Sequence, residues 1–348
     1  MHSVLAARTD FSVGESILTT KLLIKNAVDV GAKAVAMTDT MSITGMIDFT
    51  NKAKAEKLKP IIGVRLRLVD NPTWRPGKDE KKKDMPRAYF LTAYARTEAG
   101  MKSIFRLLTL ANSDDRFYYE PKLGFSDLYD ELKALSGKDL AIVLGDAHSV
   151  LEHPHADGIV RTIKDEVELV YAPLIPIDTP YYGRLNDLAL EKVVDVGISP
   201  IVVRPAFYGQ GEADTQEIMT AISENHKVTD GWFRSRHNRD MHMMGTPELV
   251  GEMKKAIAHL VKRGQDPTFV AAQFKKGLLN TAELVDGVEY EWKKAEVSLP
   301  IMAPNEFAAV VEECKKGWKT RFDKPIFGHQ PDAKGAGRGL QAPPRIRA

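Results

Sequence analysis

Acidic side chains that directly follow apolar segments are the first candidates for chemistry in this sequence. Residues 34–39 form a short apolar run that ends on Asp39, which is followed by Thr40, and Glu15 lies upstream. In β/α barrels the residues just past the carboxyl ends of the strands carry the chemistry, and carboxylates can hold a hydrated Mg²⁺. Arg65 lies in the next apolar run, and its permanent positive charge disfavours a metal cation at the same site. The pattern indicates a metal-site scaffold whose ligands have been replaced.

Alternating strand and helix patterns must position these side chains. Residues 17–30 have apolar residues at helical spacing and are followed by Gly31, which suits the end of a helix. Repeated strand–helix units predict an α/β fold with a parallel sheet and right-handed crossovers. The other expected strands are residues 33–37, 61–69, 89–95, 139–144, 169–177 and 200–203, and the other expected helices are residues 45–58, 99–111, 185–196, 214–224, 247–261 and 268–284.

Composition narrows the class of protein. The 348 residues suffice for one large or two ordinary domains, and the net charge of +2 gives no global field that would attract nucleic acid. The single cysteine, Cys314, allows no disulfide framework and no cysteine-based zinc site within the chain, and it fits a reducing cytoplasm. No apolar run is long enough to cross a bilayer, and the N-terminus lacks a secretory signal pattern. We therefore expect a cytoplasmic protein with no membrane partner.

Several polar and aromatic clusters have a structural and a functional interpretation. His148 follows the turn Leu144-Gly145-Asp146, and it is the histidine that we expect to face the same cavity as Asp39. His153 and His155 are predicted to lie in a loop without a metal. Met241, Met243 and Met244 are expected to pack in the core or in a loop rather than to form a binding patch. Residues 117–119 are expected to serve packing rather than base stacking, and the lysines at 81–83 to lie at a solvated loop tip.

A series of short motifs is similar to a known family. The motifs are Thr9-Asp10-Phe11-Ser12, Ala36-Met37-Thr38-Asp39, Pro60-Ile61-Ile62-Gly63, Phe117-Tyr118-Tyr119-Glu120-Pro121-Lys122, Thr246-Pro247-Glu248-Leu249, Asn280-Thr281-Ala282-Glu283-Leu284 and Leu299-Pro300. In order and spacing, over roughly residues 1–322, they resemble the polymerase-and-histidinol-phosphatase (PHP) domain that opens the α subunit of bacterial replicative DNA polymerase III.

The resemblance implies a fold and a division of the chain. It implies a distorted (β/α)7-type PHP barrel in residues 1–285, followed by a helical connector in residues 286–324 that resembles the lead-in to a polymerase palm. The palm itself is missing from this sequence. Residues 325–348 are basic and rich in glycine and proline, so we expect a flexible tail.

The resemblance also implies where a metal cluster would be bound. Active members of the family bind metal ions that activate water for phosphoester hydrolysis. Most of the corresponding side chains here cannot ligate a metal, so we expect a degenerate site with no catalytic residue and no bound metal. The family's positions fall on Ala6, Arg8, Glu15, Asp39, Thr40, Arg65, Phe90, Pro205 and Phe207.

The two carboxylates in that set have two possible roles. We expect Glu15 and Asp39 to pair with Arg8 or Arg65, because buried charges need partners. If any metal binds, Glu15, Asp39 and His148 are the residual candidates for holding Mg or Mn.

The functional expectation follows from what the sequence lacks. It has no palm-type aspartate motif, no P-loop and no Gly-x-Gly-x-x-Gly pattern. The resemblance then implies a non-catalytic scaffold in DNA replication. Its expected partners are a polymerase core or the remainder of an α subunit and a proofreading exonuclease subunit, with DNA contacted indirectly.

Other functions and the origin of the chain stay open at this point. The alternative is a metal-dependent phosphoesterase, either a 3′–5′ exonuclease or a pyrophosphatase, and a third class is a nucleic-acid-binding module. A phage-encoded or divergent origin would explain the lost ligands. The sequence leaves open whether the chain is truncated, split or complete, and what its oligomeric state is.

Overall fold

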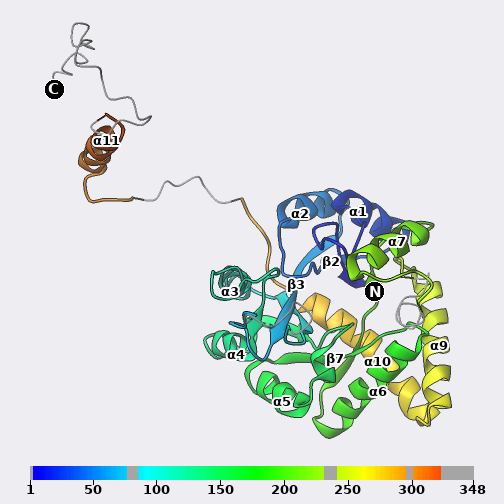
Figure 1. Cartoon of the computed structure of the whole chain (residues 1–348). Helices are drawn as coiled ribbons and strands as arrows, with labels where there is room; N and C mark the ends of the chain where they lie inside the picture. Colours follow the sequence, from blue (N-terminus) through cyan, green and yellow to red (C-terminus); the bar gives the residue numbers. More distant parts are fainter. Residues whose placement is uncertain (1–2, 77–84, 231–240, 295–300, 323–348) are drawn as a thin grey trace, which may run out of the picture. The chain divides into compact units, whose positions relative to one another are not determined.

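The computed structural model describes residues 3–76, 85–230, 241–294 and 301–322 (Figure 1). The chain divides into two compact units, Met1–Trp292 and Lys293–Ala348. The first unit continues past residue 285, since Val288 is buried and the backbone N–H of Tyr290 donates to the Arg96 carbonyl at 2.7 Å. The predicted divisions at residues 285 and 324 stay predictions. The lysines at 81–83 and the basic tail lie outside the described residues.

The first unit is built on one strongly curved sheet in the order β8-β7-β6-β4-β3-β2-β1-β9, with β5 paired to β3. Its outer strands, β8 and β9, are joined by residues 203–204, so the two ends of the sheet are brought together as a distorted barrel. The strands are β1 Ser3–Ala7, β2 Ala34–Met37, β3 Lys59–Val69, β4 Tyr89–Ala95, β5 Leu123–Gly124, β6 Leu140–Val143, β7 Leu169–Leu174, β8 Ser199–Val202 and β9 Pro205–Ala206. The predicted α/β barrel is confirmed.

The prediction of a parallel sheet holds for most strand pairs but is wrong at β4. This strand runs antiparallel to both β3 and β6, whereas the other pairings are parallel. A parallel connection needs a crossover, usually a helix. The described part of the β3–β4 connection contains no helix, so the chain returns beside β3 in the opposite direction.

Helices α1, α3, α6 and α10 begin after residues whose side chains cap them. Thr19, Thr97, Thr179 and Asp266 each accept a hydrogen bond from a backbone N–H in the first helical turn. Proline stands in the first turn of α6, α9 and α10, where no backbone donor is lost. The helices are α1 Thr20–Asp29, α2 Met46–Ala55, α3 Glu98–Ala111, α4 Phe125–Lys133, α5 Ala156–Glu166, α6 Pro180–Asp195, α7 Ala213–Glu224, α9 Thr246–Lys262, α10 Pro267–Asp286 and α11 Glu306–Phe322.

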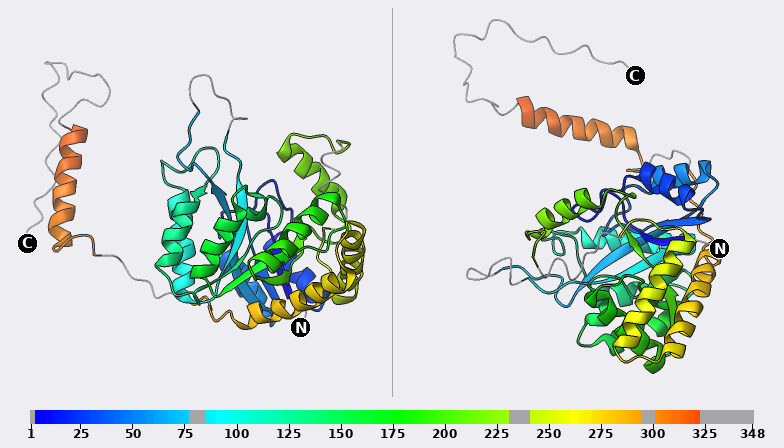
Figure 2. Two further views of the ribbon diagram at one scale, coloured as in Figure 1. Left: turned by 90° about the horizontal axis from the view of Figure 1, so that it is seen from below. Right: turned by 90° about the vertical axis from the view of Figure 1, so that its right-hand side faces the viewer.

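The helices of the first unit surround its curved sheet. The long α10 lies against β8 and beside α9, as the views in Figures 1 and 2 agree. Helices α4 and α5 were not predicted, although the buried residues of α5, Ala156, Ile159, Val160 and Ile163, have helical spacing. No described helix is both long and apolar enough to span a membrane.

His153 and the three methionines at 241, 243 and 244 are buried in the first unit. His153 is buried, with its Nε2 3.0 Å from Asp70 Oδ1 and its ring against Tyr89. The burial of Met241, Met243 and Met244 agrees with the expectation that they serve packing.

Candidate functional site

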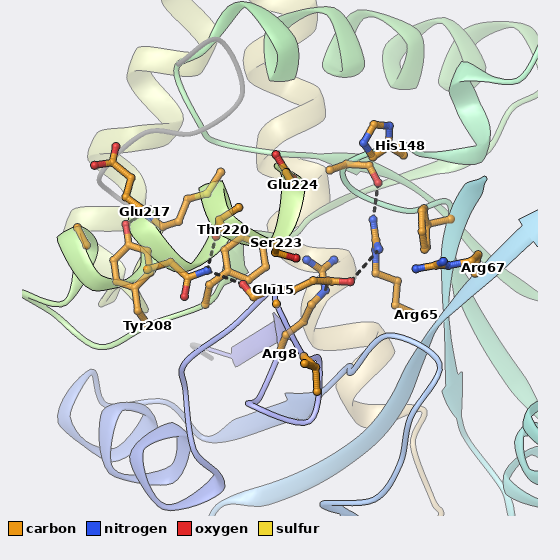
Figure 3. Close-up of a pocket in the computed structure, with 18 of the residues that line it drawn as sticks. Arg8, Glu15, Arg65, Arg67, His148, Tyr208, Glu217, Thr220, Ser223 and Glu224 are labelled. Carbon is orange, nitrogen blue, oxygen red and sulfur yellow. Dashed lines mark hydrogen bonds and ion pairs between the residues drawn. The ribbon is translucent and has the colours of Figure 1, made fainter. Parts of the chain in front are cut away.

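The predicted site residues meet at one end of the barrel. Arg8 follows β1, Asp39 follows β2, and Phe207 follows β9, while Arg65 lies within β3. A cavity of about 300 Å³ opens there (Figure 3), and its lining includes Arg8, Glu15, Arg65, Phe90, His148 and Phe207. Figure 3 also shows Glu217, Thr220 and Glu224 of α7 across the cavity. The strands therefore bring distant segments of the sequence to a common site.

Asp146 is the centre of this site, although the sequence analysis gave it no role. Its Oδ2 accepts a short hydrogen bond from Arg8 Nη2, and its Oδ1 accepts one from Arg65 Nε at 3.0 Å. Arg65 Nη2 also donates to the Ala147 carbonyl at 2.6 Å. All three charged residues are buried. One carboxylate thus bridges two arginines, one just after β1 and the other within β3.

A glycine allows β6 to deliver Asp146 to this position. Gly145 has a φ of +93°, and a Cβ atom there would lie 2.2 Å from the Phe90 carbonyl oxygen. Any other residue would be strained and would collide with the backbone of β4. The close approach of β6 to β4 therefore fixes both the turn and the direction of the carboxylate that follows it.

Glu15 is the second carboxylate that faces the arginines. Its Oε2 lies 3.5 Å from Arg8 Nε and accepts a hydrogen bond from Thr40 Oγ1 at 2.9 Å. Its Oε1 lies 3.9 Å from Arg65 Nη1. The side chain is 30% exposed, so water screens these contacts more than those of Asp146. The expected pairing of Glu15 with the arginines is present.

Asp39 has different partners from those expected. Its Oδ1 accepts hydrogen bonds from the Thr9 backbone N–H at 2.6 Å and from Ser12 Oγ at 2.7 Å, and its Oδ2 accepts one from Thr9 Oγ1 at 2.6 Å. The predicted ion pair with Arg8 or Arg65 is therefore wrong for Asp39. The turn after β1 encloses this carboxylate with neutral donors, while the guanidinium of Arg8 contacts Asp146.

Phenylalanines stack on both arginines. The guanidinium carbon of Arg65 lies 3.5 Å from the ring centroid of Phe90, and that of Arg8 lies 5.0 Å from the ring centroid of Phe207. Arg67 lies two residues after Arg65 in β3, so both side chains point to the same face of the strand. Its guanidinium carbon lies 5.4 Å from the ring centroid of Phe90. These aromatic faces stabilise desolvated guanidinium groups.

The electrostatics follow from burial and from these contacts. Burial raises the pKa of Asp146, but the two guanidinium groups of Arg8 and Arg65 outweigh it and hold that pKa below its usual value. For Arg8, burial is outweighed by Asp146 and Glu15, so its pKa is raised, whereas burial and the nearby Arg8 lower the pKa of Arg65. Burial lowers the pKa of Arg67 to about 10. Arginine side chains keep their charge in proteins, and the lowered pKa of Asp146 favours its carboxylate form.

The pKa of Asp39 moves in the opposite direction. Burial raises it, and the hydrogen bonds from Thr9 and Ser12 oppose the rise without cancelling it. The pKa values of the two buried aspartates thus shift in opposite directions, because Asp146 has cationic partners and the hydrogen-bond donors to Asp39 are neutral.

The donor set does not fit a metal cluster. Both oxygens of Asp39 and of Asp146 already accept hydrogen bonds, and the guanidinium groups of Arg8 and Arg65 lie at the centre of the site. Within residues 3–76, 85–230, 241–294 and 301–322, no group of three or more His, Cys, Asp or Glu side chains is arranged to hold an ion. His148 lines the cavity as expected, with its backbone N–H donating to Tyr181 Oη at 2.7 Å. We derive no metal-dependent step from this geometry.

The curved sheet with its site at the strand ends makes this protein an α/β barrel. Residues 5–171 match the PHP domain family. The chain thus contains a PHP domain, and it is similar to DNA polymerase III α subunits over most of its length. It is 29% identical over 344 residues to the α subunit of Yersinia pestis, covering 94% of this chain and 28% of that protein. The α subunits of Aquifex aeolicus (29% identity; 70% of this chain, 21% of that one) and Campylobacter jejuni (30%; 74% and 22%) are also similar.

The chain spans less than a third of the length of each of these curated relatives. Among solved structures, an amidohydrolase from Chromobacterium violaceum matches with a TM-score of 0.36 and 8% identity over 61% of this chain and 89% of that one, which is too distant to bear on function.

Proposed function

We propose that this chain is a non-catalytic scaffold in DNA replication, which stabilises a DNA polymerase III α-like polymerase and docks a proofreading exonuclease subunit. The observation that supports the proposal is the buried bridge from Arg8 through Asp146 to Arg65 at the barrel mouth. A hydrolytic PHP site needs metal ligands in that place. Here the charged groups bind one another instead.

The bridge suits a structural role because it joins separate strands. Arg8 follows β1, Arg65 lies in β3 and Asp146 follows β6, so the ion pairs connect parts of the sheet that are far apart in the sequence. Salt links then replace the metal bridges of active relatives and keep the barrel mouth formed. A buried charge that keeps its partners is tolerated, whereas one that loses them is strongly destabilising.

Metal analysis tests the loss of catalysis. Purified full chain, dialysed against Mn²⁺ and then against metal-free buffer, is expected to retain less than 0.1 equivalents of metal and to release no nitrophenol from nitrophenyl phosphate above the buffer rate. An active PHP phosphoesterase processed in parallel serves as the positive control. Stoichiometric metal with Mn²⁺-dependent hydrolysis would establish the phosphoesterase alternative and refute the proposal.

Co-purification tests the scaffold role directly. The tagged full chain is mixed separately with the polymerase core and with the exonuclease subunit from the same source, and each mixture is analysed by gel filtration. Co-elution with either partner supports the proposal. The Asp146→Asn variant, tested for the same co-elution, shows whether the intact barrel mouth is needed. If the wild-type chain elutes apart from both partners, the scaffold proposal fails.

A further inference from the structure

Lys122, which directly precedes β5, is a buried cation that lacks a counterion. The residue is only 3% exposed. Its Nζ lies 5.5 Å from the ring centroid of Tyr118 and has no hydrogen-bond partner among the described residues. The ring face attracts the charge, but it accepts none of the three N–H donors as an oxygen atom would. Burying a charge without a hydrogen-bonded partner is costly, so Lys122 lacks the partner that a buried ammonium group needs.

The register of the sheet places a second cation beside Lys122. In the parallel pairing of β3 with β5, Leu68 lies opposite Leu123. The residues that precede them, Arg67 and Lys122, are therefore neighbours, and their side chains point to the other face because side chains alternate along a strand. Arg67 lines the cavity at the barrel mouth (Figure 3). It pairs with Glu120 through Nη1, while its Nε has no hydrogen-bond partner within the described residues.

Arg75 is the third cation of this cluster. Its guanidinium carbon lies 5.4 Å from the ring centroid of Tyr118, the ring that Lys122 also contacts. Its two Nη atoms donate to three backbone carbonyl oxygens at 2.8–2.9 Å. Burial lowers the pKa of Lys122, and the charges of Arg75 and Arg67 lower it further. The three cations are thus close enough to repel one another.

The charges of this cluster do not balance. Glu120 is 51% exposed, so water screens its pairing with Arg67. In the part of the chain that the structure describes, neither Lys122 nor Arg75 forms an ion pair with a carboxylate. Three positive charges therefore share one partly solvated carboxylate. An anion with several acceptor oxygens would neutralise the excess and would supply the missing hydrogen-bond partners.

We propose that Lys122, Arg75 and Arg67 form a binding site for a phosphate group, either free phosphate or the terminal phosphate of a nucleotide chain. Such a group carries a charge of about −1.5 to −2 at neutral pH and has three strong acceptor oxygens. Arg67 and Arg75 are partly exposed and meet the group first. The flexible four-carbon stem of Lys122 then lets Nζ turn from the Tyr118 ring to a phosphate oxygen.

This site differs from the family's metal site. None of the three cations stands at a position that corresponds to a metal ligand of active PHP domains. The phosphate site therefore does not depend on the proposed scaffold role, and each can fail without the other.

Isothermal titration calorimetry of the full chain with inorganic phosphate tests the site at pH 7.5 and low ionic strength. Lys122→Met keeps an unbranched side chain but removes the ammonium group, and it is expected to weaken phosphate binding at least tenfold. Lys276→Met, the matched control, changes an exposed lysine of α10 and is expected to bind within twofold of the wild type. A wild-type chain that binds no phosphate at about 10 mM overturns the proposal.

Urea unfolding separates a phosphate site from a purely structural role of Lys122. Without phosphate, Lys122→Met is expected to be at least as stable as the wild type, because an unpaired buried charge is replaced by an apolar side chain. Phosphate is expected to raise the urea midpoint of the wild type and of Lys276→Met, but not that of Lys122→Met. Equal shifts in all three proteins would be a general salt effect of phosphate and would overturn the proposal.

Competition decides the source of the phosphate group. A short oligothymidylate with a 5′-phosphate is compared with the same oligonucleotide without it and with inorganic phosphate. Binding of the phosphorylated oligonucleotide at least tenfold tighter than both others assigns the end of a nucleotide chain as the ligand, and equal affinity for it and inorganic phosphate assigns free phosphate. Either result supports the site. If the wild type and Lys122→Met bind each of the three ligands equally, the proposal fails.

Discussion

Replacing Asp146 with asparagine is the most direct test of the charge network at the barrel mouth. The side chain keeps its size but loses the negative charge that both Arg8 and Arg65 contact. Its amide can accept from one guanidinium group through Oδ1, while its NH₂ group then faces donors of the other. Two buried cations would be left with Glu15, which is partly exposed, as their shared carboxylate.

The magnitude of the effect can be bounded from the geometry. The Asp146–Arg65 contact is 3.0 Å long, and one such pair is attracted by about 5 kcal/mol at an effective dielectric constant of 20. Desolvation and the repulsion between the arginines offset much of that attraction in the wild type. Removing the carboxylate leaves both costs in place, so the expected loss in free energy of unfolding is about 3–5 kcal/mol, as for other broken buried pairs.

The assay is urea denaturation of the full chain, followed by tryptophan fluorescence at neutral pH. Asp130→Asn on the exposed surface of α4 is the matched control and is expected to change the free energy of unfolding by less than about 0.5 kcal/mol. If Asp146→Asn unfolds within 1 kcal/mol of the wild type, the network does not stabilise the barrel mouth and our reasoning is refuted.

The pH dependence gives an independent check of the same group. The pKa of Asp146 is lowered in the folded state, so its contribution is complete above the unfolded pKa of about 4 and is lost as the pH falls through the folded value. The difference between wild type and Asp146→Asn should therefore shrink when the pH is lowered from 7 to 3. A difference that stays constant over this range would contradict the assigned ionisation.

Three further substitutions probe the surroundings. Arg65→Glu places a third carboxylate beside Asp146 and Glu15 and is expected to cost more than Asp146→Asn, so full stability in urea would exclude the ion-pair network. Phe90→Leu removes the ring that stacks on Arg65, and the expected loss is about 1–2 kcal/mol, with no loss indicating that the stacking is incidental. Thr9→Val removes one donor to Asp39 and should cost about 1–3 kcal/mol, and thermal unfolding that matches the wild type would argue against this bond.

The sequence allows much of the fold to be predicted but less of the site. Strand β4 is identified by a short, continuous and mostly apolar run, and helix α10 by buried residues at helical spacing. The antiparallel direction of β4 follows a connection whose described part, residues 70–76 and 85–88, contains no helix. The partners of the charged residues depend on tertiary contacts. Asp39 was expected to pair with an arginine, yet it accepts hydrogen bonds from Thr9 and Ser12 in the turn after β1.

Asp146 shows what signal was available and why it was not sufficient. Like Asp39, it follows an apolar strand, and a glycine with positive φ precedes it. A rule that every acidic residue after a strand is a candidate would have found it. The rule would not have given its partners, because Arg8 is 138 residues away in the sequence and Arg65 is 81 residues away.

The contacts at the barrel mouth make its substitutions depend on one another. Arg8 contacts Asp146 and the ring of Phe207, and Arg65 contacts Asp146 and the ring of Phe90. Placing a histidine at position 90 would remove the phenylalanine ring that stacks on Arg65 and would bring an imidazole to a place that the guanidinium group already fills. Changing both Phe90 and Arg65 would leave Asp146 with Arg8 as its one partner from this pair of arginines. A metal site can therefore be rebuilt here only by changing the arginines and the phenylalanines together, since each arginine is held by partners that a metal would displace.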